Sequence, residues 1–470
     1  MLAKRKDLIY NINYEMSKTQ PEASKERTLI SETVNNIGKL ASVRGWVHLR
    51  RDHGKLIFLS LRDRSGMLQI VVNANVSGPA YEVAKSLKPE YAVEIMGEVK
   101  KRPENAVDKG SAAGSVELEA KEITVLSKAE TLPFDMGGKD LNLELPTLLD
   151  NRGFTLRHPK IASIFKVQET VIDSFRQACK EKGFTEFQSP VIIPQGAEGG
   201  SEVFEIQYFD HKAYLSQSPQ FYKQILVGVF ERVFTVNKTL RAEPSVTTRH
   251  LTEVTTLDAE FGFINTWTDV MDMSEYVVKA MIEEVNAQNS EILKSYGVEP
   301  LKIPAKIPRM KLREAQEIIF KRTGRDNRQE PDLQPEDERE ICKWALEEKN
   351  SDLVFITHYP VSKRPFYTFE DPDDPGYSLS FDLIGRGTEW MTGGQRINDY
   401  EKLVENAKKR GIDLKKSEIY LQAFRYGMPH EGGFSLGSER VTMHILGLKN
   451  VREASLFPRD MERVDERFSH

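Results

Sequence analysis

One segment of this chain places charged side chains among residues that are typical of a protein core. In "TLRAEPSVTTRHLTEVTTLDAEFGF", Arg241 and Glu243 are two residues apart, and Arg249 and His250 are adjacent. The planar guanidinium group of arginine can bind a phosphate or a carboxylate through two parallel hydrogen bonds. The pattern therefore predicts charged groups that are held on a buried scaffold and face an anionic ligand. A simple ion pair between Arg241 and Glu243 on one face of a strand is the alternative.

A second segment, "SFDLIGRGTEWMTGGQRIND", combines acidic and hydroxyl side chains with an arginine. Asp382 and Glu389 are seven residues apart, and Thr392 and Arg396 follow them. Mg²⁺ prefers oxygen ligands, and carboxylates commonly hold this ion beside the phosphates of ATP. The segment therefore predicts a magnesium site, and a glycine-rich turn with solvated acids is the alternative.

The composition is that of an ordinary globular protein. The 470 residues, 39% hydrophobic and 29% charged, are enough for about two or three domains. No run approaches the ~20 apolar residues of a membrane span, and the polar N-terminus lacks the apolar segment of a signal peptide. Cys179 and Cys342 are the only cysteines, which excludes a disulfide framework and a cysteine-rich zinc site. We therefore expect a cytoplasmic protein with no membrane partner.

The charge is distributed unevenly along the chain. Residues 1–130 contain 21 Lys and Arg against 17 Asp and Glu, whereas the remaining 340 residues contain 45 against 54. The net charge of −5 therefore combines a basic front with an acidic body. This asymmetry is typical of a module that binds a polyanion, although ordinary variation in surface charge gives the same counts.

The elements expected in the front part have the order of an oligonucleotide-binding (OB) barrel. Residues 1–38 are charged and are expected to form an arm or a short helix. Residues 39–130 then contain three short β-type runs, a helix in "AYEVAKSL" and two further strands. Residues 131–151 combine turn residues with no clear period, so we expect a linker or hinge there.

The rest of the chain, residues 152–470, is expected to have an α+β fold. "IASIFKVQETVIDSFRQACKEKG" has apolar residues at helical spacing and ends in a glycine cap. Strands flank the Arg241 segment in a hairpin-like arrangement, and a final helix is expected around "SERVTMHILGL". Residues 288–350 are polar and helical, so they are expected to form a peripheral layer.

Three separated motifs resemble those of the class II aminoacyl-tRNA synthetases, specifically the aspartyl-tRNA synthetases of the archaeal/eukaryotic type. "KGFTEFQSPVIIP" resembles motif 1, the Arg241 segment resembles motif 2, and "GGFSLGSERVTMHILGLKNVREASLFPRD" resembles motif 3. The resemblance implies an N-terminal OB-fold barrel followed by a catalytic domain built on an antiparallel β-sheet flanked by helices. The roughly 120 residues from Phe263 to Phe381 are too few for the inserted domain of the bacterial members.

The resemblance also implies the reaction, a ligation in which ATP activates L-aspartate and tRNA accepts the aspartyl group. The implied catalytic residues are Arg241, which holds the α-phosphate and the substrate carboxylate, Arg440 on the γ-phosphate side, and Glu389. The implied ATP-binding residues are Arg241, Glu243, Arg249, His250, Leu251, Glu389, Gly437, Ser438, Glu439 and Arg440. The implied Mg²⁺ ligands are Asp382, Glu389 and Thr392, although relatives usually have serine at the position of Thr392.

The substrate side chain is expected to meet cations in "LSQSPQFYKQ". A buried aspartate carboxylate needs a cationic partner, and the resemblance assigns that role to Lys223 and Arg396. Asparaginyl relatives bind a neutral amide and do not keep this lysine. Gln220, Arg241 and Thr392 complete the implied aspartate site, Glu198 would contact the substrate ammonium, and Tyr222 lies on the same segment.

The front module is expected to bind the anticodon of tRNA. OB barrels bind single strands through aromatic stacking and basic side chains. The resemblance assigns Phe58 to stacking, with an inward barrel position as the alternative, and assigns Gln69, Arg51, Arg62 and Glu104 to base or phosphate contacts. His53 in "RRDHG" resembles relatives that also charge the tRNA for asparagine.

Motif 1, around Gly183–Pro194, implies a homodimer, because its apolar run is too hydrophobic for an exposed strand. A buried strand of the monomer is the alternative. For the activity, the alternatives are an asparaginyl-tRNA synthetase, an amide-forming synthetase that uses the adenylate with ammonia, and a non-catalytic tRNA-binding or regulatory subunit. The OB-like front argues against the amide-forming synthetase. The intact set of Arg241, Glu389 and Arg440 argues against the non-catalytic subunit.

Overall fold

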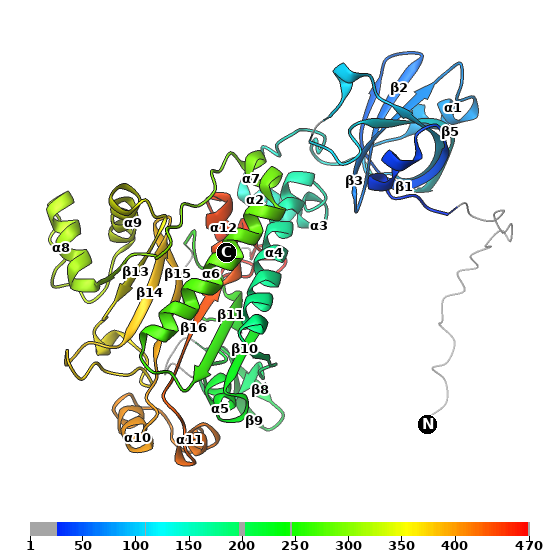
Figure 1. The fold of residues 1–470 in the computed structure, drawn as a ribbon. Helices are drawn as coiled ribbons and strands as arrows, with labels where there is room; N and C mark the ends of the chain where they lie inside the picture. Colours follow the sequence, from blue (N-terminus) through cyan, green and yellow to red (C-terminus); the bar gives the residue numbers. More distant parts are fainter. Residues whose placement is uncertain (1–25, 109, 197–202, 245–246, 469–470) are drawn as a thin grey trace, which may run out of the picture. The chain divides into compact units, whose positions relative to one another are not determined.

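The computed structural model describes residues 26–108, 110–196, 203–244 and 247–468, and the chain divides into two compact units between Lys139 and Asp140 (Figure 1). Each unit has its own hydrophobic core. None of the described helices combines the length with the apolar character that crossing a membrane would require.

The first unit is a closed five-stranded barrel with the strand order β1-β2-β3-β5-β4. Its elements are β1 (Leu40–Asp52), β2 (Leu56–Asp63), β3 (Gly66–Asn73), α1 (Pro79–Ser86), β4 (Ala92–Lys101) and β5 (Val116–Ser127). Alternate residues of each strand point into the core, as the two-residue period of a strand requires. The expected succession of three strands, a helix and two strands is therefore confirmed.

The arm expected at residues 1–38 ends earlier than that boundary. A short 3₁₀ helix, η1 (Ile30–Asn36), packs on the barrel, and the side chain of Ile30 is fully buried in its core. The backbone N–H of Ile30 donates to Asp63 Oδ2 at 3.1 Å. Burial of one isoleucine stabilises the fold by roughly 1.5–3 kcal/mol, which explains why this part of the polar segment is attached to the barrel.

The second unit is built on an eight-stranded sheet with the order β12-β13-β14-β15-β16-β11-β10-β6. The strands are β6 (Thr185–Glu186), β10 (Arg232–Leu240), β11 (Glu253–Gly262), β12 (Arg309–Lys311), β13 (Leu353–Thr357), β14 (Ser380–Gly385), β15 (Thr388–Gln395) and β16 (Glu431–Gly437). The strands from β13 to β10 pair antiparallel, whereas the edge strands β12 and β6 pair parallel with their neighbours. The expected antiparallel sheet is confirmed at its centre.

Long helices cover one face of this sheet. Helices α4 (Pro159–Glu181) and α6 (Thr268–Gln288) pack side by side, and α12 (Ser438–Leu446) packs beside α4 (Figure 1). Their apolar faces share one core with the central strands. The helix predicted before Gly183 is present, and Gly183 has the positive φ of 78° that suits a glycine beyond a helix end.

The segment at residues 288–350 contains helices and one strand. Helices α7 (Ser290–Tyr296), α8 (Leu312–Thr323) and α9 (Pro335–Lys349) are joined there by β12, which extends the sheet. Helix α9 packs on β13, β14 and β15 (Figure 1). The segment is therefore partly integrated into the sheet, because β12 and α9 bury apolar side chains against it.

The remaining elements complete the second unit and connect its layers. They are α2 (Leu145–Asp150), α3 (Arg152–Thr155), α5 (Gln220–Phe230), α10 (Tyr400–Lys409), α11 (Glu418–Arg425), the 3₁₀ helices η3 (Val361–Lys363) and η4 (Val451–Ala454), and a three-stranded sheet β7-β9-β8 of Ile192–Ile193, His211–Leu215 and Glu205–Tyr208. The first unit also has a short 3₁₀ helix, η2 (Glu104–Ala106).

A half-buried histidine in α12, His444, predicts how the stability of this unit depends on pH. His444 stacks on Trp390 with ring centroids 6.1 Å apart, and burial together with the Arg440 charge lowers its pKa to about 4. Below about pH 6.5 the unfolded chain binds a proton here that the folded chain does not bind until about pH 4. Stability therefore falls as the pH drops through this window, by at most about 3 kcal/mol from this one group.

We expect His444→Gln to flatten the pH dependence of unfolding between pH 7 and pH 4.5, because glutamine does not titrate. Urea unfolding followed by tryptophan fluorescence at several pH values measures this slope. The exposed His211 provides the matched control, since His211→Gln should keep the wild-type slope. An unchanged slope in His444→Gln would contradict the assignment of this pH dependence to His444.

Candidate active site

Two adjoining cavities contain most of the residues predicted for the site. One, of about 510 Å³, is lined by the predicted residues Gln220, Lys223, Arg241, Glu389, Thr392 and Arg396. The other, of about 90 Å³, is lined by Arg241, Glu243, Arg249, His250, Leu251, Glu389, Thr392, Gly437 and Arg440. Arg241, Glu389 and Thr392 line both cavities, so the side chains expected to meet the reacting groups lie between the two.

The strand registers explain how residues that are distant in the sequence share one surface. Asp258 of β11 is opposite Ser435 of β16, Ser435 is opposite Thr392 of β15, and Thr392 is opposite Asp382 of β14. Directly opposed residues point to the same face of a sheet. These four side chains therefore form a polar row across four strands, and two of them, Thr392 and Asp382, are predicted site residues.

A buried charge cluster lies at one end of this row. Lys223 Nζ is 3.3 Å from Asp258 Oδ1 and 3.0 Å from Glu260 Oε2, and all three side chains are at most 1% exposed. Arg396 Nε donates to Glu260 Oε1 at 2.7 Å. Burial would raise the pKa of Glu260, but the charges of Arg396 and Lys223 outweigh it and lower that pKa. The two predicted cations are therefore held by shared carboxylate partners.

The carboxylate partners of these cations, Asp258 and Glu260, were not among the residues predicted from the sequence. Asp258 and Glu260 alternate in "TTLDAEFGF", and this spacing places both on one face of a strand. Acidic residues inside an otherwise apolar strand are rare unless they are paired, so this spacing was a usable signal.

Gln220 is the first member of a chain of hydrogen bonds between buried side chains. Gln220 Nε2 donates to Gln224 Oε1 at 2.9 Å, and Gln224 Nε2 donates to Glu431 Oε1 at 2.8 Å. Burial and the nearby charge of Glu260 raise the pKa of Glu431 well above its usual value. This shift favours the protonated form of Glu431, because a further negative charge beside Glu260 is unfavourable there.

Each arginine of the smaller cavity has a glutamate nearby. The guanidinium-to-carboxylate distances are 3.8 Å for Arg241–Glu243, 2.8 Å for Arg249–Glu338 and 4.0 Å for Arg440–Glu389. Arg241 and Glu243 do therefore approach each other, as the ion-pair alternative supposed, but the distance is long and both also line the cavity. Burial and the three arginine charges lower the pKa of His250, so its ring is neutral at pH 7.

Several predicted residues are not on the cavity surface. Ser438 and Glu439 are buried beneath it, where both carboxylate oxygens of Glu439 accept from the backbone N–H of Thr255 at 3.0 and 3.1 Å. This contact joins β11 to the first turn of α12, where the negative charge of Glu439 is also favourable. Tyr222 does not line either cavity, and Glu198 lies outside the described residues.

The residues predicted to bind magnesium suit that ion chemically. Asp382 Oδ1 is buried without a hydrogen-bond partner among the described residues, and Thr392 is directly opposite Asp382. Arg364 Nη2 donates to Asp382 Oδ2 at 2.9 Å. Desolvation and the Asp382 charge raise the pKa of Glu389, which indicates that the two acids repel each other when no cation lies between them. Carboxylate and hydroxyl oxygens are hard donors, so the set fits Mg²⁺.

The barrel presents three of its predicted residues on one outer surface. Phe58 points outward, opposite Arg51 in the register, and its ring makes an edge contact with His53 at 5.8 Å between centroids. Gln69 is on the neighbouring strand, where Arg102 donates to its Oε1 at 3.1 Å. The inward alternative for Phe58 is therefore wrong.

The other two predicted barrel residues differ from this arrangement. Arg62 donates to Glu90 Oε2 at 2.8 Å and stacks on Trp46, so its guanidinium already has a carboxylate partner. This pairing makes it less available for a phosphate. Glu104 begins η2 and is exposed.

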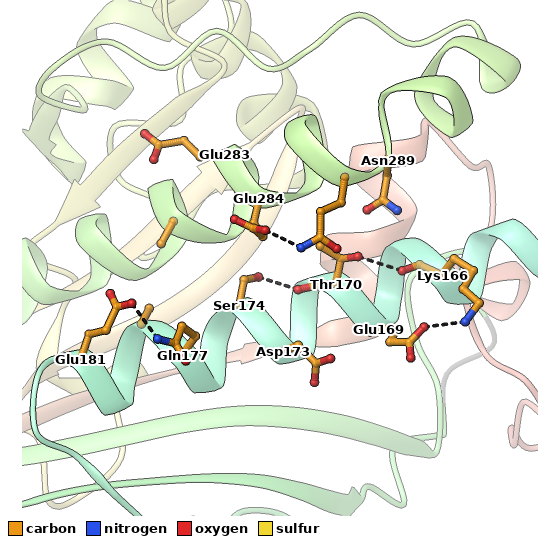
Figure 2. A pocket seen from close by; sticks show the side chains of 13 residues that line it. Lys166, Glu169, Thr170, Asp173, Ser174, Gln177, Glu181, Glu283, Glu284 and Asn289 are labelled. Atoms are coloured by element: carbon orange, nitrogen blue, oxygen red, sulfur yellow. Dashed lines mark hydrogen bonds and ion pairs between the residues drawn. The ribbon is translucent and has the colours of Figure 1, made fainter. Parts of the chain in front are cut away.

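A larger cavity, of about 720 Å³, contains none of the predicted residues. It is a polar groove between α4 and α6, and Figure 2 shows acidic and amide side chains of both helices along it. Ser174 Oγ donates to the Thr170 carbonyl at 2.6 Å, and Gln177 Nε2 donates to Glu181 at 2.8 Å (Figure 2). Both hydrogen bonds lie within α4, whereas the predicted site residues come from several strands and helices and line shared cavities.

An OB barrel followed by an antiparallel sheet with an arginine-rich site is the architecture of class II aminoacyl-tRNA synthetases. The family described as "tRNA synthetases class II (D, K and N)" matches residues 144–461, and the OB-fold nucleic acid binding domain matches residues 41–126. The chain belongs to this synthetase family, whose members are ligases.

Individual relatives are similar over almost their whole length. An aspartate–tRNA(Asp/Asn) ligase from Aeropyrum pernix is 40% identical, over 93% of this chain and 98% of the relative. An aspartate–tRNA(Asp) ligase from Pyrococcus abyssi is 37% identical, with the same coverage. The crystal structure of asparaginyl-tRNA synthetase from Pyrococcus horikoshii with asparaginyl-adenylate has a TM-score of 0.84 and 31% identity, covering 93% of this chain and 99% of that one.

Proposed function

We propose that this protein is an aspartate–tRNA ligase, which activates L-aspartate with ATP and transfers the aspartyl group to the 3′ end of tRNA. The observation that carries the proposal is the pair of cations, Lys223 and Arg396, in a cavity that adjoins the arginine-rich one. A buried substrate carboxylate requires such partners. The names of the relatives from Aeropyrum pernix and Pyrococcus abyssi support the choice of aspartate.

In the first proposed step, an oxygen of the substrate α-carboxylate attacks the α-phosphorus of ATP. The bond from this phosphorus to the bridging oxygen breaks, and pyrophosphate leaves with the electron pair. Both reactants are anions, so positive charge must be fixed where negative charge develops. Arg241 would bind the α-phosphate and the α-carboxylate from its position between the cavities, and Arg440 would bind the γ-phosphate side.

The other proposed contacts orient the two substrates. Lys223 and Arg396 would bind the side-chain carboxylate of aspartate, with Gln220 and Thr392 beside it and Glu198 at the ammonium group. Asp382, Glu389 and Thr392 would hold Mg²⁺, which when bound supplies positive charge to the phosphate oxygens. In the second step a hydroxyl of the terminal ribose attacks the acyl carbon, and AMP leaves.

Exchange of labelled pyrophosphate into ATP tests the proposal. We expect exchange with L-aspartate and much less with L-asparagine, since a neutral amide lacks the negative charge that would interact with Lys223 and Arg396. Exchange driven by asparagine alone would favour the asparaginyl alternative. No exchange with either amino acid would favour the non-catalytic one.

For the barrel, we propose that residues 39–130 bind the anticodon through Phe58, Gln69 and Arg51, and that residues 131–151 connect it to a catalytic domain at 152–470. The exposed edge contact between His53 and Phe58 lies on the proposed binding surface. We also propose that tRNA(Asn) is accepted, as the name of the Aeropyrum pernix relative states for that protein. Charging purified tRNA(Asn) with labelled aspartate tests this, and the absence of product would exclude it.

We further propose that the protein is a homodimer through the motif 1 region, Gly183–Pro194. Strand β7 is at the edge of its sheet, and Val191 and Ile192 are 37% and 46% exposed. An apolar edge strand of this kind favours pairing with a second copy. Sedimentation velocity should report twice the chain mass, and a stable monomer would contradict the proposal.

Two buried, unpaired cysteines are compatible with a cytoplasmic location, which we also propose.

A further inference from the structure

Glu338 is a buried acid outside the three motifs, and it contacts Arg249, which lines the smaller of the two adjoining cavities. It lies in the first turn of α9, and its side chain is 11% exposed. Its Oε2 accepts from Arg249 Nη1 at 2.8 Å. No other hydrogen bond involves the Arg249 guanidinium within the described part of the chain.

The location of Arg249 explains why such a partner matters. Residues 247–250 form a turn without regular secondary structure, so the backbone alone does not fix the direction of a long, flexible side chain. One hydrogen bond from Nη1 restricts the orientation of the guanidinium and leaves Nε and Nη2 available for a bidentate phosphate contact. The partially exposed Arg249 lines the same cavity as Arg241 and Arg440.

Burial of the Glu338 carboxylate is energetically unfavourable, which argues against an incidental contact. Burial, offset only in part by Arg249, and the nearby Glu389 charge raise the pKa of Glu338 to about 7. Glu340 of the same helix pairs instead with Arg322 of α8 at 2.6 Å. The buried position of Glu338 therefore serves the cavity and not only the packing of α9.

We propose that Glu338 is a positioning residue that orients Arg249 toward the phosphates of ATP. The inference rests on the proposed function and on the ATP-binding role that the resemblance implies for Arg249. It gives α9 a direct connection to ATP binding, although the sequence of this helix resembles that of a solvated surface helix.

The test compares Arg249→Ala, Glu338→Ala, Glu338→Gln and the double variant Arg249→Ala/Glu338→Ala in aspartate-dependent pyrophosphate exchange. We expect Glu338→Ala to raise the KM for ATP about tenfold, the loss expected for one charge-assisted contact, with the KM for aspartate unchanged. Glu338→Gln keeps the acceptor oxygen and should show a smaller rise. In the Arg249→Ala background, loss of Glu338 should have no further effect. Glu340→Ala is the matched control and should behave as wild type.

The possible outcomes distinguish a failure of the positioning role of Glu338 from a failure of the ATP-binding role of Arg249. If Arg249→Ala raises the KM for ATP and Glu338→Ala does not, or if the two effects multiply in the double variant, the positioning role is wrong and the nucleotide site stands. If Arg249→Ala leaves the KM for ATP unchanged, the nucleotide assignment and the positioning role both fall. Should Glu338→Ala not fold, ATP binding to Glu338→Gln is measured by calorimetry. Weaker ATP binding than in wild type supports the positioning role, and unchanged ATP binding contradicts it.

Discussion

Lys223→Met is expected to reduce kcat/KM for aspartate in pyrophosphate exchange about a thousandfold, while ATP binding is retained. Methionine has nearly the volume of lysine but no charge, so the substrate carboxylate loses a cationic partner. Asp258 and Glu260 also lose the ammonium that lies 3.3 and 3.0 Å from them. Removing one partner of a buried ion pair costs about 3–5 kcal/mol, which corresponds to roughly two to four powers of ten.

Lys238→Met is the matched control for this variant. Lys238 is on β10 of the eight-stranded sheet. Its side chain is 52% exposed and pairs with Glu253 at 3.5 Å. We expect near wild-type exchange, since exposed ion pairs contribute at most about 1 kcal/mol. Calorimetric titration with ATP separates a local loss of the aspartate site from general unfolding. Full aspartate activation in Lys223→Met would mean that the substrate carboxylate binds elsewhere.

Arg241→Ala is expected to lower kcat for aspartate activation about a thousandfold, with a smaller effect on either KM. Arg241 lines both cavities, so its guanidinium is positioned to meet charge that develops during the reaction. Fixed donors aimed at such charge contribute about two to three powers of ten in kcat, and catalytic arginines in phosphoryl transfer contribute up to about five. Arg241→Lys should recover little, because an ammonium group lacks the planar fork.

Arg425→Ala provides the comparison for Arg241→Ala. Both arginines are 41% exposed and both lie near a glutamate, but Arg425 is on α11 and lines neither cavity. Single-turnover measurement of adenylate formation isolates the chemical step from product release. A change confined to the KM for ATP, with kcat intact, would show that Arg241 contributes only to ground-state binding.

Local sequence patterns predicted the elements that position the site. The long helix before Gly183, the hairpin of β10 and β11 and the order of the barrel elements follow from hydrophobic periodicity and turn residues. The residues of motif 2 are close together in the sequence and lie on adjoining segments. Their shared cavity was therefore predictable without knowledge of the whole sheet.

The parts that were not predicted depend on long-range pairing or on the direction of a single side chain. Glu338 is one of several acids at the start of α9, and only the packing of that helix on the sheet shows which of them is buried. Ser438 and Glu439 point away from the cavity because of the way α12 follows β16, which a motif does not reveal. Arg62 depends on Glu90, a partner 28 positions later in the chain.

The row formed by Asp258, Ser435, Thr392 and Asp382 has a consequence for substitutions at these positions. Main-chain pairing fixes the spacing of these positions, so exchanging a side chain there leaves the scaffold unaltered. A point substitution at one of these positions can therefore change the polarity of this face of the sheet without loop remodelling.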